Sequence, residues 1–205
     1  MNEEYYIIER GLKKGPYTFS EIMQMDIDIH TEVITASNDK TQYASELSEL
    51  NEYFESKGIY FPTVDNLAGF GKRAGAFFID YVGWYILLSN IILRTSIVAL
   101  PAAYRFGDPV PPEMLKLSLL MLGSFLVYNT ICEATGLKGS FGKKILRLMV
   151  VDIDGQRLSF ARAFLRNLGV VLSITIWIPF LSVLFSEHRQ AWYDSWAKTY
   201  VIKTN

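Results

Sequence analysis

The sequence predicts an α-helical membrane bundle that follows a small α+β domain. Half of the 205 residues are apolar, which is a high share for a soluble protein. Residues 1–69 contain 5 Lys and Arg against 13 Asp and Glu, whereas residues 70–205 contain 15 against 8. The second region also holds three long apolar stretches flanked by basic residues, a pattern typical of helices beside anionic lipid headgroups. One region is therefore expected in water and the other in the bilayer.

Composition shifts divide the chain into three parts. We expect a small domain over residues 1–57, a linker over residues 58–70 that contains Gly58, Pro62 and Gly69, and a membrane domain over residues 71–205. The N-terminus has no basic segment followed by an apolar one, so we expect no cleavable signal peptide. The small domain is thus predicted to stay in the cytosol.

The small domain reads as a hairpin, a short helix and a third strand. Residues 5–8 form a strand pattern, residues 10–15 a turn, and residues 16–19 a second extended segment. Ser20 stands where the N-cap of a brief helix is expected. Residues 31–35 form the next strand pattern, and residues 44–54 place Leu47, Leu50 and Phe54 at helical spacing, so that they close the core.

The order Tyr5-Tyr6, then Gly15-Pro16-Tyr17-Thr18-Phe19-Ser20-Glu21-Ile22, then Thr31-Glu32-Val33-Ile34 resembles the bacterial GYF-like domain. The resemblance implies a groove for a proline-rich or extended peptide, because flat aromatic faces receive a polyproline helix. The candidate residues of this groove are Tyr6, Pro16, Tyr17 and Phe19. The alternative is that these side chains form the core that so small a domain needs.

Three apolar stretches are long enough to enter a bilayer. The first runs over residues 74–93 and contains Asp80, and the second runs over residues 115–132. The third, residues 164–185, is interrupted by Trp177-Ile178-Pro179. The connection between the second and third stretches is richer in basic residues than the connection after the first stretch, so it is expected in the cytosol. The chain is thus expected to be a multi-pass protein of the bacterial inner membrane.

Two strand patterns in the last third of the chain help to decide whether the third apolar stretch crosses the bilayer once or is broken. Residues 145–152 read as a strand, followed by an Asp-Gly turn that leads to Arg157-Leu158-Ser159, and residues 199–202 read as another strand. If the tail pairs with the earlier strand, both lie on the cytosolic side. We therefore favour a broken or re-entrant third stretch over one straight span.

An ionisable group inside an apolar span costs roughly 2.5 to 3.5 kcal/mol on insertion scales, so Asp80 requires a partner. Arg73 lies seven residues earlier on the same helix face, at a distance of about 10 Å along the axis, where a third polar group or water could bridge the two. Arg73, Asp80 and Asp194 stand where the three residues that give the RDD family its name are expected, and the chain resembles this family over residues 70–203. Residues 142–155 resemble the family's strand and turn, and Arg166 resembles the arginine that opens its last apolar stretch.

The RDD resemblance implies ion/proton or small-solute transport. In this reading Asp80 binds a cation or a proton, Arg73 competes with the cation, and Asp194 and Glu133 form the cytosolic mouth. The same polar cluster could instead fix helix packing alone. A third reading is an adaptor that recruits a peptide partner through residues 1–57 and is anchored by the membrane part.

Other classes of function lack their motifs. A single cysteine and two histidines cannot build a zinc cluster, so we expect no metal and no cofactor. Nucleotide loops and nucleophile elbows are missing too, hence we expect no enzyme activity. The expected partners are the lipid bilayer and a second copy or another membrane subunit, and we expect no nucleic acid.

Overall fold

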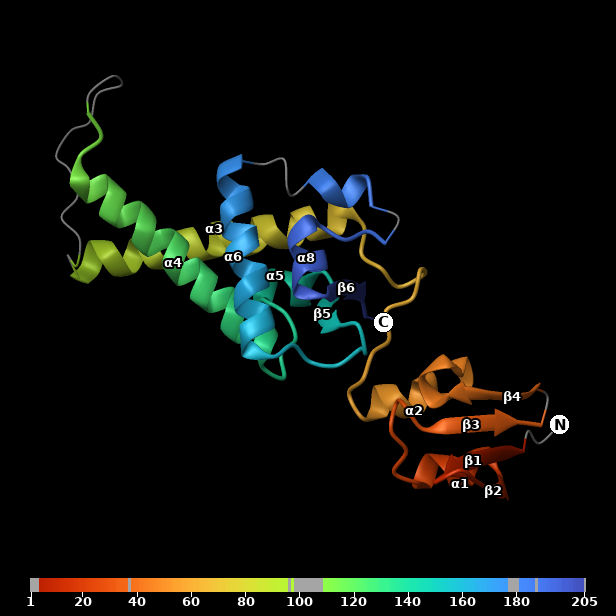
Figure 1. Ribbon diagram of the computed structural model, residues 1–205. Coiled ribbons are helices and arrows are strands. Elements are labelled where there is room, and N and C mark those ends of the chain that lie inside the picture. Colours follow the sequence, from red (N-terminus) through yellow and green to blue (C-terminus); the bar gives the residue numbers. More distant parts are fainter. Residues whose placement is uncertain are drawn as a thin grey trace. The chain divides into compact units, whose positions relative to one another are not determined.

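The computed structural model describes residues 4–36, 38–95, 97, 109–176, 181–186 and 188–204. The chain forms two compact units: unit 1 comprises Met1–Phe61 and Asp154–Gln156, and unit 2 comprises Pro62–Ile153 and Arg157–Asn205. Figure 1 labels the helices and strands of both units. The predicted combination of a small sheet region with long apolar helices is present.

Unit 1 is built on a four-stranded antiparallel sheet in the order β2-β1-β3-β4. Its strands are β1 (Tyr5–Glu9), β2 (Leu12–Tyr17), β3 (Glu32–Thr35) and β4 (Asn38–Tyr43). The predicted hairpin and third strand are confirmed. The sequence did not predict β4, because its residues, Asn-Asp-Lys-Thr-Gln-Tyr, lack the apolar alternation of a half-buried strand.

Two local details of unit 1 differ from the prediction. The turn between β1 and β2 is shorter than expected, because Arg10 and Gly11 both adopt positive φ angles, 53° and 76°, as in a two-residue hairpin turn. Thr18 rather than Ser20 caps helix α1 (Phe19–Gln24). The Thr18 hydroxyl accepts from the Glu21 amide, and the Glu21 carboxylate accepts from the Thr18 amide at 2.7 Å, which is a capping box.

The core of unit 1 lies between the sheet and the segment that follows it. This segment contains two 3-10 turns (Ala44–Glu46 and Ser48–Leu50) and helix α2 (Asn51–Ser56). Leu47, Leu50 and Phe54 are buried there as predicted, together with Tyr5 and Ile22. The small domain therefore owes its core to residues from both ends of its sequence.

Within its described residues, unit 2 contains two helices that are long and apolar enough to cross a membrane, α3 (Phe70–Thr95) and α4 (Pro112–Ala134). They contain the first two predicted stretches. Helix α6 (Phe160–Ile176) begins the third stretch, but residues 177–180 lie outside the described residues, and with them the predicted interruption at Trp177-Ile178-Pro179. A third span is thus not shown.

A two-stranded sheet joins distant parts of unit 2. Strand β5 (Leu148–Asp152) pairs antiparallel with β6 (Thr199–Lys203), with Val150 opposite Val201. The predicted strand starts three residues later than expected, because helix α5 (Phe141–Ile145) precedes it and Arg147 turns the chain with a φ of 53°. Residues 157–159 are not a strand. The partner of β5 is instead the tail, which places both segments on one side of any membrane.

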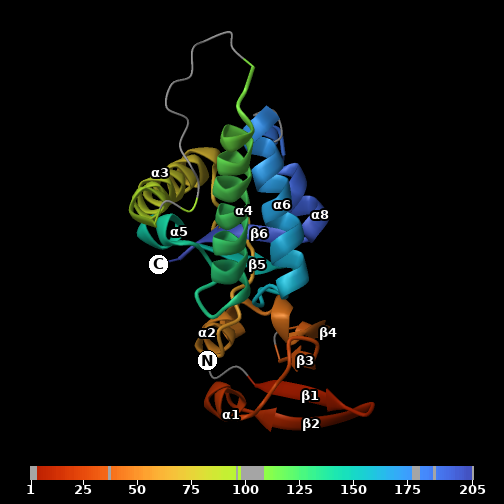
Figure 2. The ribbon, with the colours of Figure 1, turned by 90° about the vertical axis from the view of Figure 1, so that its left-hand side faces the viewer.

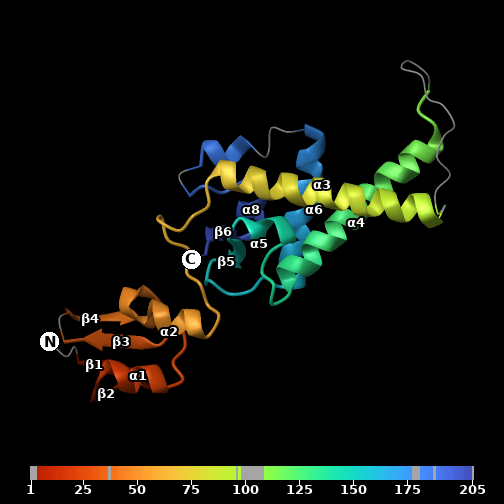
Figure 3. The ribbon, with the colours of Figure 1, turned by 180° about the vertical axis from the view of Figure 1, so that it is seen from behind.

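The helices of unit 2 pack in pairs. Figure 2 shows α4 and α6 side by side, with the short helix α8 (Trp192–Ala197) next to α6. Figure 3 shows α3 crossing α4 obliquely. At this crossing the Trp84 ring stacks on Tyr128 with centroids 4.9 Å apart, and the Trp84 indole N–H donates to the Ser124 hydroxyl at 3.1 Å. Aromatic stacking and one hydrogen bond thus fix the two long helices at one point.

Candidate functional site

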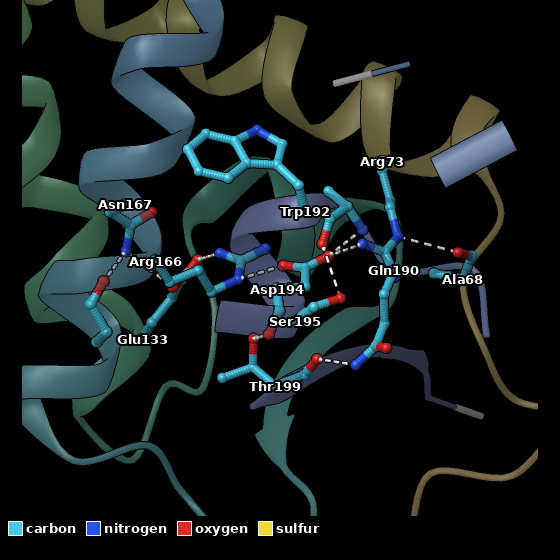
Figure 4. Close-up of polar contacts among 12 residues, drawn as sticks. Ala68, Arg73, Glu133, Arg166, Asn167, Gln190, Trp192, Asp194, Ser195 and Thr199 are labelled. Atoms are coloured by element: carbon cyan, nitrogen blue, oxygen red, sulfur yellow. Dashed lines mark hydrogen bonds and ion pairs between the residues drawn. The ribbon is translucent and has the colours of Figure 1, made fainter. Parts of the chain in front are cut away.

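Arg73, in the first turn of α3, is bound to two other segments of unit 2. Its Nε donates to the Ala68 carbonyl at 3.0 Å, Nη2 donates to the Arg189 carbonyl at 2.6 Å, and Nη1 pairs with Asp194 Oδ2 at 2.5 Å. The side chain is buried, and Figure 4 shows it directed at Asp194. A guanidinium stays charged when it is buried, so its burial is tolerated only when its donors are paired in this way.

Asp194, on α8, accepts bonds from both sides. One carboxylate oxygen pairs with Arg73 and accepts from the Ala191 amide at 3.0 Å, while the other accepts from Arg166 Nε at 2.8 Å. Burial raises the pKa of Asp194, but the charges of Arg166 and Arg73 outweigh it, so that the pKa lies below its usual value. Asp194 is therefore a carboxylate fixed between two arginines.

Glu133, in the last turn of α4, is fixed in the same manner. It pairs with Arg166 Nη1 at 2.6 Å and with Lys143 Nζ at 3.0 Å, and it accepts from the Asn167 amide at 2.8 Å. The Glu133 side chain is fully buried. Arg166 therefore bridges the two carboxylates, and Figure 4 shows it between Glu133 and Asp194.

Asp80, in the middle of α3, has a different environment. Its carboxylate accepts from the Gly142 amide at 2.7 Å, from the Tyr128 hydroxyl at 3.2 Å and from the Ser140 hydroxyl. The side chain is 4% exposed. In the part of the chain that the structure describes, no lysine or arginine forms an ion pair with it. Asp80 is thus a buried carboxylate held by neutral donors.

Gly142 is what allows the backbone of α5 to reach Asp80. A Cβ atom at this position would lie 2.2 Å from the Ala76 carbonyl oxygen and 2.9 Å from Asp80 Cγ. Either distance is a severe overlap, so only glycine permits this approach of α5 to α3. The contact between the two helices therefore depends on the absence of a side chain.

Lys143 connects the two parts of this network. Its ammonium pairs with Glu133 and also donates to the Ser140 hydroxyl at 3.1 Å, and that hydroxyl bonds to Asp80. Polar contacts thus run without interruption from Arg73 to Asp80. We call this set the polar chain; in order its members are Arg73, Asp194, Arg166, Glu133, Lys143, Ser140 and Asp80. Basic and acidic groups alternate along it, and their formal charges cancel.

A small cavity of about 30 Å³ lies beside the polar chain, which is roughly the volume of one water molecule in the liquid. Among the described residues, its polar lining consists of three basic side chains, two amides and one phenol: Arg73, Lys143, Arg166, Asn129, Asn167 and Tyr193. A hydrated ion does not fit in this space.

Comparisons with known proteins match the region of the sequence that contains the polar chain. The profile described as "RDD family" matches residues 67–198. The chain belongs to the RDD family. An uncharacterized protein of Bacillus subtilis (strain 168), YxaI, is 31% identical over 148 residues, which cover 66% of this chain and 96% of that protein. No solved structure matches the chain.

The RDD match covers all members of the polar chain and leaves out residues 1–66. The resemblance of the N-terminal region to a GYF-like domain therefore stays a prediction. Within the RDD region, the structure brings Arg73, Glu133, Arg166 and Asp194 into direct contact. It does not join Arg73 to Asp80. The predicted bridge between these two is replaced by the longer route through Asp194, Arg166, Glu133, Lys143 and Ser140.

Sequence reasoning missed several members of the RDD site. Ser140, Gly142 and Lys143 were not among the residues expected in the site, whereas they contact Asp80 and Glu133. Asn167 was missed too, although its position next to Arg166 on an otherwise apolar helix is a usable signal, because a buried amide requires partners. Among the described residues, no group of three metal-ligating side chains occurs.

Three of the predicted peptide-binding residues, Tyr6, Pro16 and Tyr17, lie in the β1-β2 hairpin of unit 1, and Phe19 begins α1. Pro16 and Phe19 are exposed, while Tyr6 and Tyr17 are half-buried. The Lys13 ammonium lies over the Tyr6 ring, 4.1 Å from its centroid. Tyr5, by contrast, is buried in the core. Two of the four candidates therefore face solvent, and the other two are partly covered.

Proposed function

We propose that the RDD region moves a small monovalent cation or a proton across the inner membrane of a bacterium, with Asp80 as the exchangeable carboxylate. The observation that supports this is the contrast between Asp80 and the other two buried carboxylates. Asp194 and Glu133 each contact two basic side chains. Within the described parts of the chain, Asp80 accepts from neutral donors alone, so its negative charge is available to an incoming cation.

The donors around Asp80 suit such an exchange. The hydroxyls of Tyr128 and Ser140 can turn and present lone pairs, because a hydroxyl is both donor and acceptor. With the carboxylate they offer the oxygen ligands that hard cations prefer. A proton on Asp80 would equally be accommodated, with the carboxyl group then donating to the Ser140 hydroxyl.

The remaining members of the polar chain have a supporting role in this proposal. Paired carboxylates between arginines are poor binding sites, because a cation must displace a buried guanidinium. Arg73 therefore holds α8 through Asp194 and does not compete directly for Asp80. The Asp80 side chain is 4% exposed, so transport requires a second conformation in which Asp80 reaches water.

Two long apolar helices are few for a complete transport path. We expect a homo-oligomer or a partner membrane subunit to supply the rest, with closed symmetry as the usual arrangement. Unit 1 is expected in the cytosol, on the side of the basic connection between α4 and α6.

Flux in proteoliposomes tests the proposal. Purified full-length protein is reconstituted, and the internal pH is followed after addition of sodium, potassium or lithium salts. We expect a cation-dependent pH change that Asp80→Asn abolishes and that Ser140→Ala reduces. Asp65→Asn is the matched control, because Asp65 is an exposed carboxylate of unit 2 outside the helices. The absence of flux in the wild type with all three cations would reject transport.

The second candidate is an adaptor, and it is supported by the exposed Pro16 and Phe19 beside Tyr17. Fluorescence anisotropy of a labelled proline-rich peptide with the full-length protein in detergent tests it. We expect binding that Tyr17→Ala and Phe19→Ala both weaken. The control is Val64→Ala, an exposed apolar residue of unit 2. A peptide that binds equally well to all variants, or to none, would contradict the adaptor role.

A further inference from the structure

A groove with apolar walls runs beside the crossing of α3 and α4. Its volume is about 530 Å³. Aromatic and aliphatic side chains line it, with the hydroxyls of Ser89 and Ser118 among them: Tyr81, Trp84, Tyr85, Ile92 and Leu93 from α3, Leu117, Met121, Leu122 and Phe125 from α4, and Ile174 from α6. Three helices therefore form the groove, and no described segment fills it.

The length of the groove matches one leaflet of a bilayer. On α3 the lining extends from Tyr81 to Leu93, which is about 18 Å at the helical rise of 1.5 Å per residue. On α4 it extends from Leu117 to Phe125, which is about 12 Å by the same rise. Half of a hydrocarbon core of about 30 Å is about 15 Å. The groove thus has the reach of a single extended acyl chain.

Charge is concentrated at one end of the groove. Leu93 and Leu117 line this end, and their sequence neighbours Arg94 and Lys116 are both exposed. Among the described residues, neither forms an ion pair. Glu113 is the one acidic residue of α3 and α4 near this end, so the local formal charge is positive. A basic pair at the interface, next to an apolar groove, is complementary to a phosphate headgroup attached to an acyl chain.

We propose that this groove binds one anionic phospholipid in the leaflet opposite the basic α4-α6 connection. Its phosphate contacts Arg94 and Lys116, and one acyl chain lies between α3 and α4 toward Tyr81 and Phe125. This proposal requires that α3 and α4 cross the bilayer, and it does not depend on the proposed transport. In this arrangement a lipid chain fills the space beside the crossing of α3 and α4 that side chains do not.

Native mass spectrometry of the full-length protein, released from detergent after incubation with phosphatidylglycerol or phosphatidylcholine, tests this site. We expect one phosphatidylglycerol per chain to be retained in preference to phosphatidylcholine. Each basic residue near a membrane surface contributes about fivefold to the affinity for an anionic lipid. Arg94→Gln and Lys116→Gln should each lower retention by about that factor, and the double variant by more than tenfold.

Two further variants separate the site from general lipid adhesion. Lys72→Gln removes an exposed basic residue at the other end of α3, and it should leave retention unchanged. Ser118→Trp fills the groove and should abolish lipid retention. If the Ser118→Trp variant fails to fold, the Arg94→Gln and Lys116→Gln variants still test the site. The proposal would be overturned if the wild type retained both lipids equally, or if Lys72→Gln lost as much lipid as the groove variants. A dimer without lipid would also overturn it, because a second copy of the chain would then occupy the groove.

Discussion

Arg73 of α3 and Asp194 of α8 are 121 residues apart in the sequence and form a buried ion pair of 2.5 Å in unit 2. This pair joins the start of the first long helix to the end of the chain. Arg166 extends it to Glu133 and hence to α4. Helices α3, α4 and α6 and the C-terminal segment therefore share one electrostatic centre.

Loss of one partner of the Arg73–Asp194 pair should destabilise the protein severely. Arg73→Ala leaves Asp194 with a single arginine, and removal of one partner of a buried pair costs about 3 to 5 kcal/mol. Thermal unfolding of the protein in detergent measures this as a lower Tm. The neighbouring Lys72→Ala, exposed on the same turn, should keep the wild-type Tm. A wild-type Tm in Arg73→Ala would show that the pair contributes nothing to folding.

Acid should weaken the fold through Asp194. Its pKa is lower in the folded protein than the ordinary value of about 3.9 in an unfolded chain. The resulting stability is complete above that ordinary value and is lost as the pH falls through the folded pKa. We expect a constant Tm between roughly pH 5 and 7 and a fall below about pH 4. Asp194→Asn should have a low Tm at neutral pH and a smaller decrease on acidification, and an unchanged acid response would exclude Asp194 as its source.

Gly142→Ala should separate α5 from α3. The added methyl group overlaps the Ala76 carbonyl and the Asp80 carboxylate, and relief of such crowding costs about 1 to 3 kcal/mol. The same shift lengthens the bond from the Gly142 amide to Asp80. Gly83→Ala is the control, because nothing lies within 4 Å of a Cβ atom there. Thermal unfolding should show a loss for the first variant only, and equal Tm values would mean that α5 accommodates the methyl group.

The β5-β6 pairing places the tail and the basic connection on the same side of the membrane. In a Cys132→Ser background, Thr204→Cys and Arg157→Cys should both react with a membrane-impermeant maleimide in inside-out vesicles and stay unlabelled in intact cells. Paired strands cannot lie on opposite sides of a bilayer. Opposite labelling of the two positions would disprove this arrangement.

The sequence was most informative where structure is a local property. The two long helices follow from continuous apolar length, and β1, β3 and β6 follow from short alternating or β-branched runs. The buried Arg73, Asp80 and Asp194 attract attention in the sequence because ionisable groups are rare near apolar segments.

Their pairing could not be predicted from spacing. Arg73 and Asp80 share a helix face, but both find nearer partners from segments distant in sequence, and only the fold brings Asp194, Ser140 and Gly142 to them. Lys143 resembled any other basic residue of a cytosolic turn, because the buried Glu133 opposite it is not evident in the sequence. Tertiary partners of charged groups are thus the part of the site that requires coordinates.

The sequence separation of Arg73 and Asp194 also sets an order for biogenesis. Arg73 leaves the ribosome 121 residues before its partner, which at about 5 to 20 residues per second is a delay of roughly 6 to 24 s. Throughout that interval the guanidinium must remain in water or at the headgroups, because no carboxylate of α8 exists to accompany it into the protein. The start of α3 can therefore reach its final, paired position only after Asp194 has been synthesised.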